Sequence, residues 1–101
     1  MIIVSNTSPI NYLILIEQID LLAKIFQHII IPKAVYSELS DPPKWLLIQS
    51  VRQTSDQILD LLDPGERAAI LLAQELNADL LLLDDMKARL TAKDRGLAIA
   101  A

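Results

Sequence analysis

Cysteine is absent from this chain of 101 residues. Its absence excludes disulfides, thiolate zinc sites and cysteine nucleophiles, and it fits a reducing compartment. Aromatic residues make up only 4% of the chain, whereas hydrophobic residues make up 52%. We therefore expect an aliphatic core of Ile, Leu, Val and Ala. Only two glycines are present, Gly65 and Gly96, which excludes a glycine-rich phosphate-binding loop.

Long hydrophobic runs are also missing. No stretch reaches the ~18 apolar residues that cross a membrane, and residues 1–4 lack the basic segment of a signal peptide. We therefore expect a cytoplasmic protein with no membrane partner. The chain has no internal repeats, low-complexity tracts or linkers, so its length indicates a single domain over residues 1–101.

Acidic residues outnumber basic residues by 13 to 9, which gives a net charge of −4. This balance argues against broad, non-specific binding to nucleic acid. It does not exclude a nuclease, because a metal-binding cluster of acids is itself negative. His28 is the only histidine and precedes a predicted strand instead of following one. Nothing therefore supports a Ser-His-Asp set, which would have to use it.

Short apolar runs alternate with helical patterns along the chain. Strands are predicted at residues 2–4, 29–31, 45–51, 79–83 and 97–101, the third being the weakest and centred on Leu47 and Ile48. Helices are predicted at residues 9–16, 20–26, 32–39, 67–76 and 85–95, and residues 54–62 are predicted to be helical or irregular. Such alternation is typical of an α/β fold, in which helices cover both faces of a parallel sheet of four or five strands.

Several residues suit the ends of these helices. Thr7 or Ser8 can cap the first helix, and Asp20 can cap the second. The segment 63–66, Asp-Pro-Gly-Glu, is a strong start for a helix that should be central and buried. Gly96 suits the residue just after the last helix.

The pair Asp84 and Asp85 follows the apolar run Leu80–Leu83 directly. In an open α/β sheet, ligands bind outside the carboxyl ends of the strands, and two adjacent carboxylates at that point repel one another unless a cation neutralises them. The alternative is that one of them caps the following helix, which leaves the second without a structural role. If the first strand lies beside the fourth, Asn6 faces this pair across one crevice, although the sequence alone leaves the strand order open.

Three further residues could join such a site, and each has a simpler alternative. The amide oxygen of Asn6 can ligate a hard cation or only form a turn into the helix. Glu38 can be a solvated surface acid, but an acid near a helix C-terminus is opposed by the helix dipole. Glu66 lies three residues after Asp63, the spacing of a capping box. The basic residues Arg67, Lys87, Arg89, Lys93 and Arg95 can contact phosphates or form an ordinary solvated helix face.

Four segments, in this order along the chain, resemble the successive motifs of PIN-domain proteins. They are residues 2–9 (IIVSNTSP), 31–39 (IPKAVYSEL), 65–70 (GERAAI) and 82–85 (LLDD). The nearest resemblance is to the prokaryotic PIN-like branch related to VapC-type toxins. It covers almost the whole chain and implies a three-layer α/β/α fold with strand order 3-2-1-4-5.

The resemblance also implies a function and a site. The expected activity is that of a Mg²⁺- or Mn²⁺-dependent endoribonuclease of the toxin-antitoxin type, acting on RNA as a homodimer with a small antitoxin as partner. Carried over to this chain, the catalytic acids fall on Glu38, Glu66 and Asp85, and Asn6 and Asp84 complete the metal ligands. The residues expected to bind substrate are Thr7, Ser8, Arg67 and Lys87.

Two departures from the family pattern stand out. The usual first-strand acid is Asp, whereas this chain has Asn6, which removes a charge from the site. The family normally continues past the fifth strand, whereas this chain stops at Ala101, as a fragment, a shortened protein or one completed by a partner would. These departures support an alternative function, a catalytically degenerate PIN-fold module that acts through protein–protein binding. Tyr12 and Leu15 would suit a dimer interface if exposed.

Overall fold

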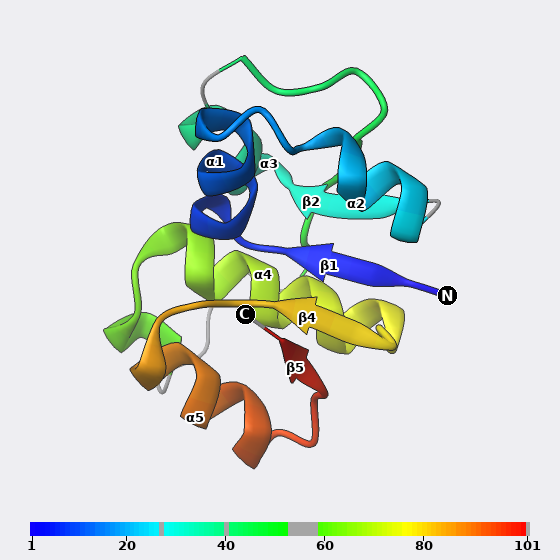
Figure 1. Cartoon of the computed structure of the whole chain (residues 1–101). Coiled ribbons are helices and arrows are strands. Elements are labelled where there is room, and N and C mark those ends of the chain that lie inside the picture. The colour runs from blue at the N-terminus through cyan, green and yellow to red at the C-terminus, as the bar shows by residue number, and fades with distance from the viewer. Residues whose placement is uncertain (27, 40, 53–58, 101) are drawn as a thin grey trace.

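The computed structural model describes residues 1–26, 28–39, 41–52 and 59–100. Strands and helices alternate along these residues, as Figure 1 shows. The strands are β1 (Ile3–Ser5), β2 (Ile29–Pro32), β3 (Leu47–Gln49), β4 (Leu80–Leu82) and β5 (Ile99–Ala100). The helices are α1 (Thr7–Leu15), α2 (Asp20–Ile25), α3 (Lys33–Glu38), α4 (Pro64–Leu76) and α5 (Met86–Asp94), with a 3₁₀ turn at Leu59–Leu61.

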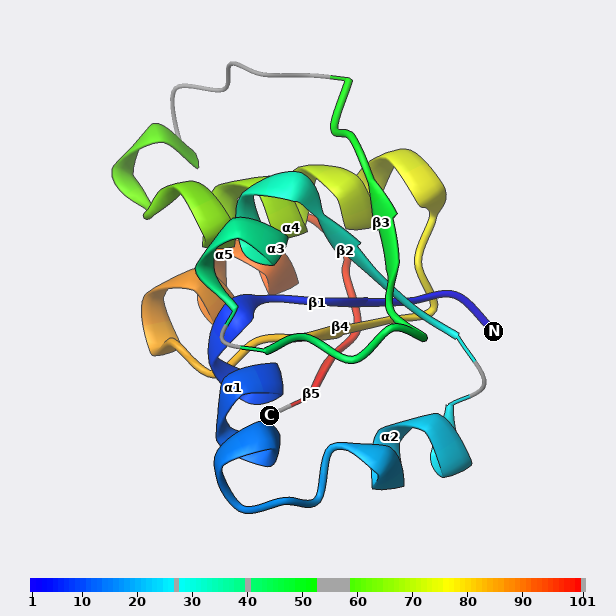
Figure 2. The ribbon, with the colours of Figure 1, turned by 90° about the horizontal axis from the view of Figure 1, so that it is seen from above.

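The strands form one parallel sheet with the order β3-β2-β1-β4-β5. In β1, Ile3 is in register with Ile29 of β2 on one side and with Leu80 of β4 on the other. Helices α4 and α5 lie on one face of the sheet, and α1 and α2 lie on the other (Figure 2). The predicted α/β/α fold and strand order are therefore confirmed.

The core is aliphatic, as the composition predicts. On the α4 and α5 side, Ile70, Leu72 and Leu81 belong to one buried cluster. On the opposite side, Ile10 of α1 packs in a second cluster with Ile29 and other residues of the sheet. A helix or strand that buries such side chains is held mainly by the removal of apolar surface from water. Together the two clusters hold α1, α3, α4 and the central strands in fixed positions.

The first helix begins earlier than the sequence predicts. Asn6 occupies the N-cap position and Thr7 is the first helical residue, so the prediction that Thr7 or Ser8 caps a helix starting at Pro9 is wrong. A proline in the first turn lacks an N–H that would have no partner inside the helix. The helix can therefore extend two residues ahead of Pro9.

The other helix ends follow the sequence more closely. Asp63 and Glu66 form the predicted capping box at the start of α4. After α5, Gly96 has a φ of +79°, and its N–H and that of Leu97 donate to carbonyls of the last turn, as in a Schellman motif. One prediction fails, because Asp20 is the first residue of α2 and the N-cap position belongs to Ile19.

Two sequence predictions extend beyond the described residues. Of the segment 54–62, residues 54–58 lie outside them, and the remainder contains the 3₁₀ turn. Ala101, the last residue of the predicted fifth strand, also lies outside them. Within the described ranges, none of the helices has the length and apolar character needed to cross a membrane.

Candidate metal centre

The candidate site lies at the carboxyl ends of β1, β2 and β4. Helices α1, α4 and α5 all begin along this edge, at the left of Figure 1. Asn6 follows β1, Glu38 is the last residue of α3, and Asp84 and Asp85 follow β4. Glu66 enters the same edge from the first turn of α4. The topology therefore brings side chains that are far apart in sequence to one end of the sheet.

Three oxygens converge on Gly65, the residue before Glu66. A Cβ atom added at Gly65 would lie 2.7 Å from Glu38 Oε1, 3.1 Å from Asn6 Oδ1 and 3.4 Å from Thr7 Oγ1. We call these three oxygens the Gly65 oxygen cluster. They come from α1, α3 and the residue between β1 and α1, and they all surround one point at the start of α4.

Two oxygens of this cluster have no hydrogen-bond partner in the part of the chain that the structure describes. Asn6 is only 4% exposed, and among the described residues its Oδ1 and Thr7 Oγ1 are buried and unpartnered. Asn6 stands at the N-cap of α1, yet its side chain makes no capping hydrogen bond, so the alternative that it only forms a turn into the helix does not account for it. A buried polar atom without a partner costs about 1–3 kcal/mol. A bound cation or a water molecule at this point would satisfy both oxygens.

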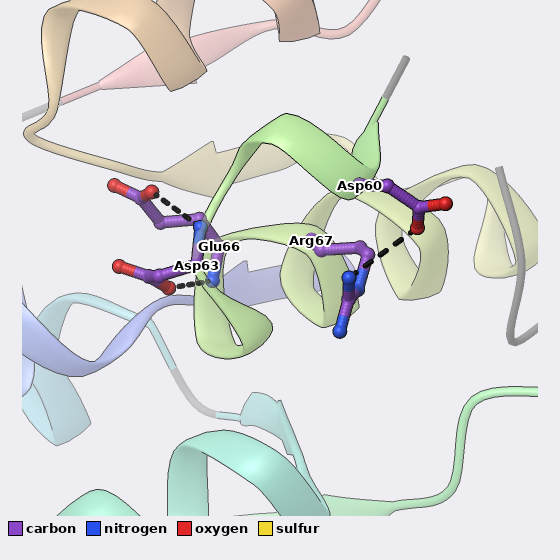
Figure 3. A network of polar contacts seen from close by, with 4 residues as sticks. All are labelled: Asp60, Asp63, Glu66 and Arg67. Carbon is purple, nitrogen blue, oxygen red and sulfur yellow. Dashed lines mark hydrogen bonds and ion pairs between the residues drawn. The ribbon is translucent and has the colours of Figure 1, made fainter. Parts of the chain in front are cut away.

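Apart from the Gly65 oxygen cluster, the site contains three acids at the starts of α4 and α5, namely Asp63, Glu66 and Asp85. Asp63 accepts a hydrogen bond from the N–H of Glu66 at 2.8 Å, and Glu66 accepts one from the N–H of Asp63 at 3.4 Å, as drawn in Figure 3. Burial, together with the negative charges of Asp63 and Asp85, raises the pKa of Glu66 to about 7. A cation placed here would favour the charged form of Glu66.

Asp85, and not Asp84, caps α5. Its Oδ2 accepts a hydrogen bond from the N–H of Ala88 at 3.0 Å. Asp84 is exposed, and the structure shows it no hydrogen-bond or ion-pair partner among the described residues. The family resemblance implies a place for Asp85 in the site, so the carboxylate that caps α5 is the same one that is expected to act there.

The residues expected to bind substrate differ in how accessible they are. The guanidinium of Arg67 points away from Asp63 and Glu66 and pairs with Asp60 at 3.3 Å (Figure 3). Lys87 is exposed on the first turn of α5, and Ser8 is exposed on the first turn of α1. The structure therefore leaves Lys87 and Ser8 accessible, whereas Arg67 already has a carboxylate partner.

The oxygens of the site are of the type that hard divalent cations prefer. Carboxylate, amide and hydroxyl oxygens ligate Mg²⁺ and Mn²⁺ well. Two of the oxygens at Gly65 have no hydrogen-bond partner within residues 1–26, 28–39, 41–52 and 59–100. In the described part of the chain, no group of three or more Asp, Glu or His side chains lies close enough together to hold a metal ion without other ligands. A divalent cation at this site would therefore need the oxygens of Asn6 and Thr7 as well as the carboxylates.

One residue of the site could not be assigned a role from the sequence alone. Gly65 carries no functional group, but it leaves the space in which the three oxygens meet. A weak signal was present, because a glycine in a helix is less favourable than alanine by about 1 kcal/mol and this chain has only two glycines.

The chain was also compared with known proteins. A PIN-domain family model (DUF3368) matches residues 2–100, and no curated protein matches the chain. The fold is similar to that of a PilT N-terminus domain protein from the hyperthermophilic archaeon Sulfolobus solfataricus P2. The TM-score is 0.73 at 23% sequence identity, and the match covers 99% of this chain and 86% of that chain. The PIN domain is a nuclease-type fold that generally uses divalent metal ions, and this chain belongs to the PIN-domain family.

Proposed function

We propose that this protein is an endoribonuclease of the VapC-like toxin type that requires Mg²⁺ or Mn²⁺. One observation carries the proposal: the buried, unpartnered oxygens of Asn6 and Thr7 face the carboxylate of Glu38 at the carboxyl end of the sheet. A fold held only by its core has no need of these oxygens. They match the ligand chemistry of a hard divalent cation.

In this proposal Glu38, Glu66 and Asp85 are the catalytic acids, and Asn6 and Asp84 complete the metal ligands. A bound divalent cation would lower the pKa of a coordinated water and stabilise charge on the scissile phosphate. Glu66 releases its proton near neutral pH, so at that pH its charge depends on its surroundings. The carboxylate of Asp85 can keep its cap through Oδ2 while Oδ1 faces a ligand.

The start of α1 suits an anionic substrate. No side chain caps this helix, so the first N–H groups of α1, at Thr7 and Ser8, retain their positive partial charge. A phosphate group binds favourably at such a helix start. Lys87, exposed on α5, adds a positive charge on the opposite side of the site. RNA, with one phosphate per nucleotide, is the substrate that we propose.

The test is a calorimetric titration with Mn²⁺ of the wild-type protein and of Asp85→Asn, together with an RNA cleavage assay. Asn caps a helix about as well as Asp, so we expect this variant to fold normally while it loses saturable Mn²⁺ binding and cleavage. Unchanged Mn²⁺ binding in Asp85→Asn would remove Asp85 from the site. A wild-type protein that binds no divalent cation and cleaves no RNA would overturn the proposed function.

A second candidate is the degenerate PIN-fold module that acts through protein–protein binding. The apolar surface of α1 and α2 favours it, because Tyr12, Leu15 and Ile25 are 63%, 81% and 68% exposed. Exposed apolar surface of this kind marks interaction sites, and a second copy of the chain is the partner that we propose, with an antitoxin-like protein as the other partner that the resemblance implies. Analytical ultracentrifugation that finds only monomer at high concentration would contradict the dimer.

A further inference from the structure

The glycine at position 65 is not explained by backbone conformation. Gly96 is the glycine with a positive φ, whereas Gly65 is a buried residue in the first turn of α4, where any residue can adopt the helical conformation. Alanine would be the more favourable residue in such a helix. The reason for glycine must therefore lie in what surrounds it.

The surroundings are the three oxygens of the Gly65 oxygen cluster. A Cβ at this position would stand 2.7 Å from Glu38 Oε1, closer than carbon and oxygen approach without a bond. It would also stand 3.1 Å from Asn6 Oδ1, a tight contact with a side chain that is almost fully buried. A side chain at position 65 would thus occupy the region in which the Glu38 carboxylate meets the Asn6 amide.

We propose that Gly65 is a positioning residue for the divalent-cation site, because its missing Cβ lets the Glu38 carboxylate reach the buried oxygens of Asn6 and Thr7. The inference rests on the proposed function and adds a residue that acts only through its neighbours. The ligand class is a divalent cation that prefers oxygen, such as Mn²⁺ or Mg²⁺. Gly65 itself contributes no donor atom.

The effect on binding is separable from the effect on folding. Glu38 is the exposed last residue of α3, and the atom nearest to a new Cβ is the far end of its flexible side chain. Glu38 can therefore swing away from a Cβ at small cost to the fold. Asn6 is 4% exposed and cannot follow, so the two oxygens are separated.

The first experiment is a calorimetric Mn²⁺ titration of wild-type protein and of Gly65→Ala, with the thermal unfolding of both measured in a chelator. We expect Mn²⁺ to bind about tenfold or more weakly to Gly65→Ala, in line with the effect of residues that orient metal ligands. The unfolding temperature of the chelated protein should change little, because the helix preference of alanine offsets the cost of its tight contact with Asn6. A Gly65→Ala protein that binds Mn²⁺ as tightly as wild type would overturn the inference.

A double-variant cycle makes the test specific to the Gly65–Glu38 contact. Glu38→Asp shortens the side chain by one methylene and withdraws the carboxylate from a new Cβ. We expect Glu38→Asp to weaken Mn²⁺ binding in wild type by about tenfold, and to weaken it much less, or to strengthen it, when it is added to Gly65→Ala. Because residues in contact show non-additive effects, strictly additive losses in affinity would overturn the inference even if Gly65→Ala folds poorly.

The same Mn²⁺ titration of a further variant, Glu38→Gln, distinguishes the two proposals from one another. If wild type binds Mn²⁺ and Glu38→Gln abolishes binding while Gly65→Ala does not weaken it, the metal site stands and the role of Gly65 falls. If wild type binds no Mn²⁺ at all, the proposed function falls, and the positioning role of Gly65 falls with it.

Discussion

The polar side chains on the two sides of the α4 N-terminus differ in their hydrogen bonding. On one side, the oxygens of Asn6 and Thr7 are buried and, among the described residues, unpartnered. On the other side, the carboxylates of Asp63 and Glu66 satisfy backbone N–H groups at the start of α4, and Asp85 does the same for α5. The oxygens of the first side satisfy no backbone group among the described residues, whereas those of the second side hold two helix ends in place.

This difference shows how one edge of the sheet can both hold helix ends in place and offer oxygens to a ligand. A carboxylate has two oxygens, so a helix cap can use one of them while the other remains available to a ligand. A substitution on the capped side that removes the capping acceptor should therefore lower stability, and at a carboxylate that also binds the cation it should weaken cation binding as well. A substitution on the Gly65 side that adds no charge should change cation binding and leave stability almost unaffected, or even improve it by removing an unsatisfied polar atom.

The largest effect that we expect on the capped side is a pH dependence of stability without metal. The pKa of Glu66 rises from 4.5 to about 7 in the folded protein. Between these values the folded protein keeps a proton that the unfolded chain has released, so the free energy of unfolding falls as pH rises through this window and then levels off. The loss should be on the order of 3 kcal/mol, measured by urea denaturation in a chelator.

Glu66→Gln is the matched control for this pH dependence. Gln keeps a side-chain oxygen that can accept from the N–H of Asp63, and it does not titrate. Its stability should therefore decline less than that of wild type between pH 4.5 and 7. Parallel curves for the two proteins would show that another group causes the decline.

The next effect is the loss of the capping box itself. Asp63→Ala removes the acceptor of the Glu66 N–H, and we expect it to lower the free energy of unfolding by about 1–2 kcal/mol. Asp63→Asn keeps an acceptor at the N-cap and should stay within about 0.5 kcal/mol of wild type. Glu38→Gln, on the Gly65 side, should also leave stability unchanged. A loss in Glu38→Gln as large as that in Asp63→Ala would abolish the distinction between the two sides.

The fold was largely predictable from the sequence because its signals are local. Apolar runs such as Ile29–Ile31 mark strands that are buried on both faces, and the Asp63 to Glu66 spacing predicted the capping box that the structure contains. The start of α1 was not predictable in the same way. Pro9 is compatible with several positions in the first turn, so the residue at which the helix begins depends on how Asn6 is buried against the rest of the fold.

The candidate site was predictable only in part. The sequence left open whether Asp84 or Asp85 caps α5, because both carboxylates precede the helix and only their orientation distinguishes them. The approach of Glu38 to Gly65 depends on how α3 packs against α4, a tertiary contact with no local signature. The assignment of Glu38 therefore came from the family resemblance, and its tertiary surroundings came from the structure.

The smallest effect that we expect is also the sharpest probe of the Gly65 side. Asn6→Asp restores the acid that the family normally carries at this position, next to Glu38. The added charge should tighten Mn²⁺ binding several-fold and at most about tenfold, which corresponds to ~1.4 kcal/mol or less. In a chelator the same substitution should lower stability, because it buries a carboxylate without a partner. Calorimetric titration and urea denaturation of the same samples measure both effects.

Gln18→Glu is the control for the change in net charge. Gln18 is exposed beyond the end of α1 opposite to Asn6, so its substitution should change neither Mn²⁺ affinity nor stability appreciably. If Asn6→Asp and Gln18→Glu behave alike, the Asn6 oxygen does not contact the cation, and its burial has another cause. If only Asn6→Asp tightens Mn²⁺ binding while it destabilises the chelated protein, then the neutral amide trades cation affinity for a fold that remains stable when the site is empty.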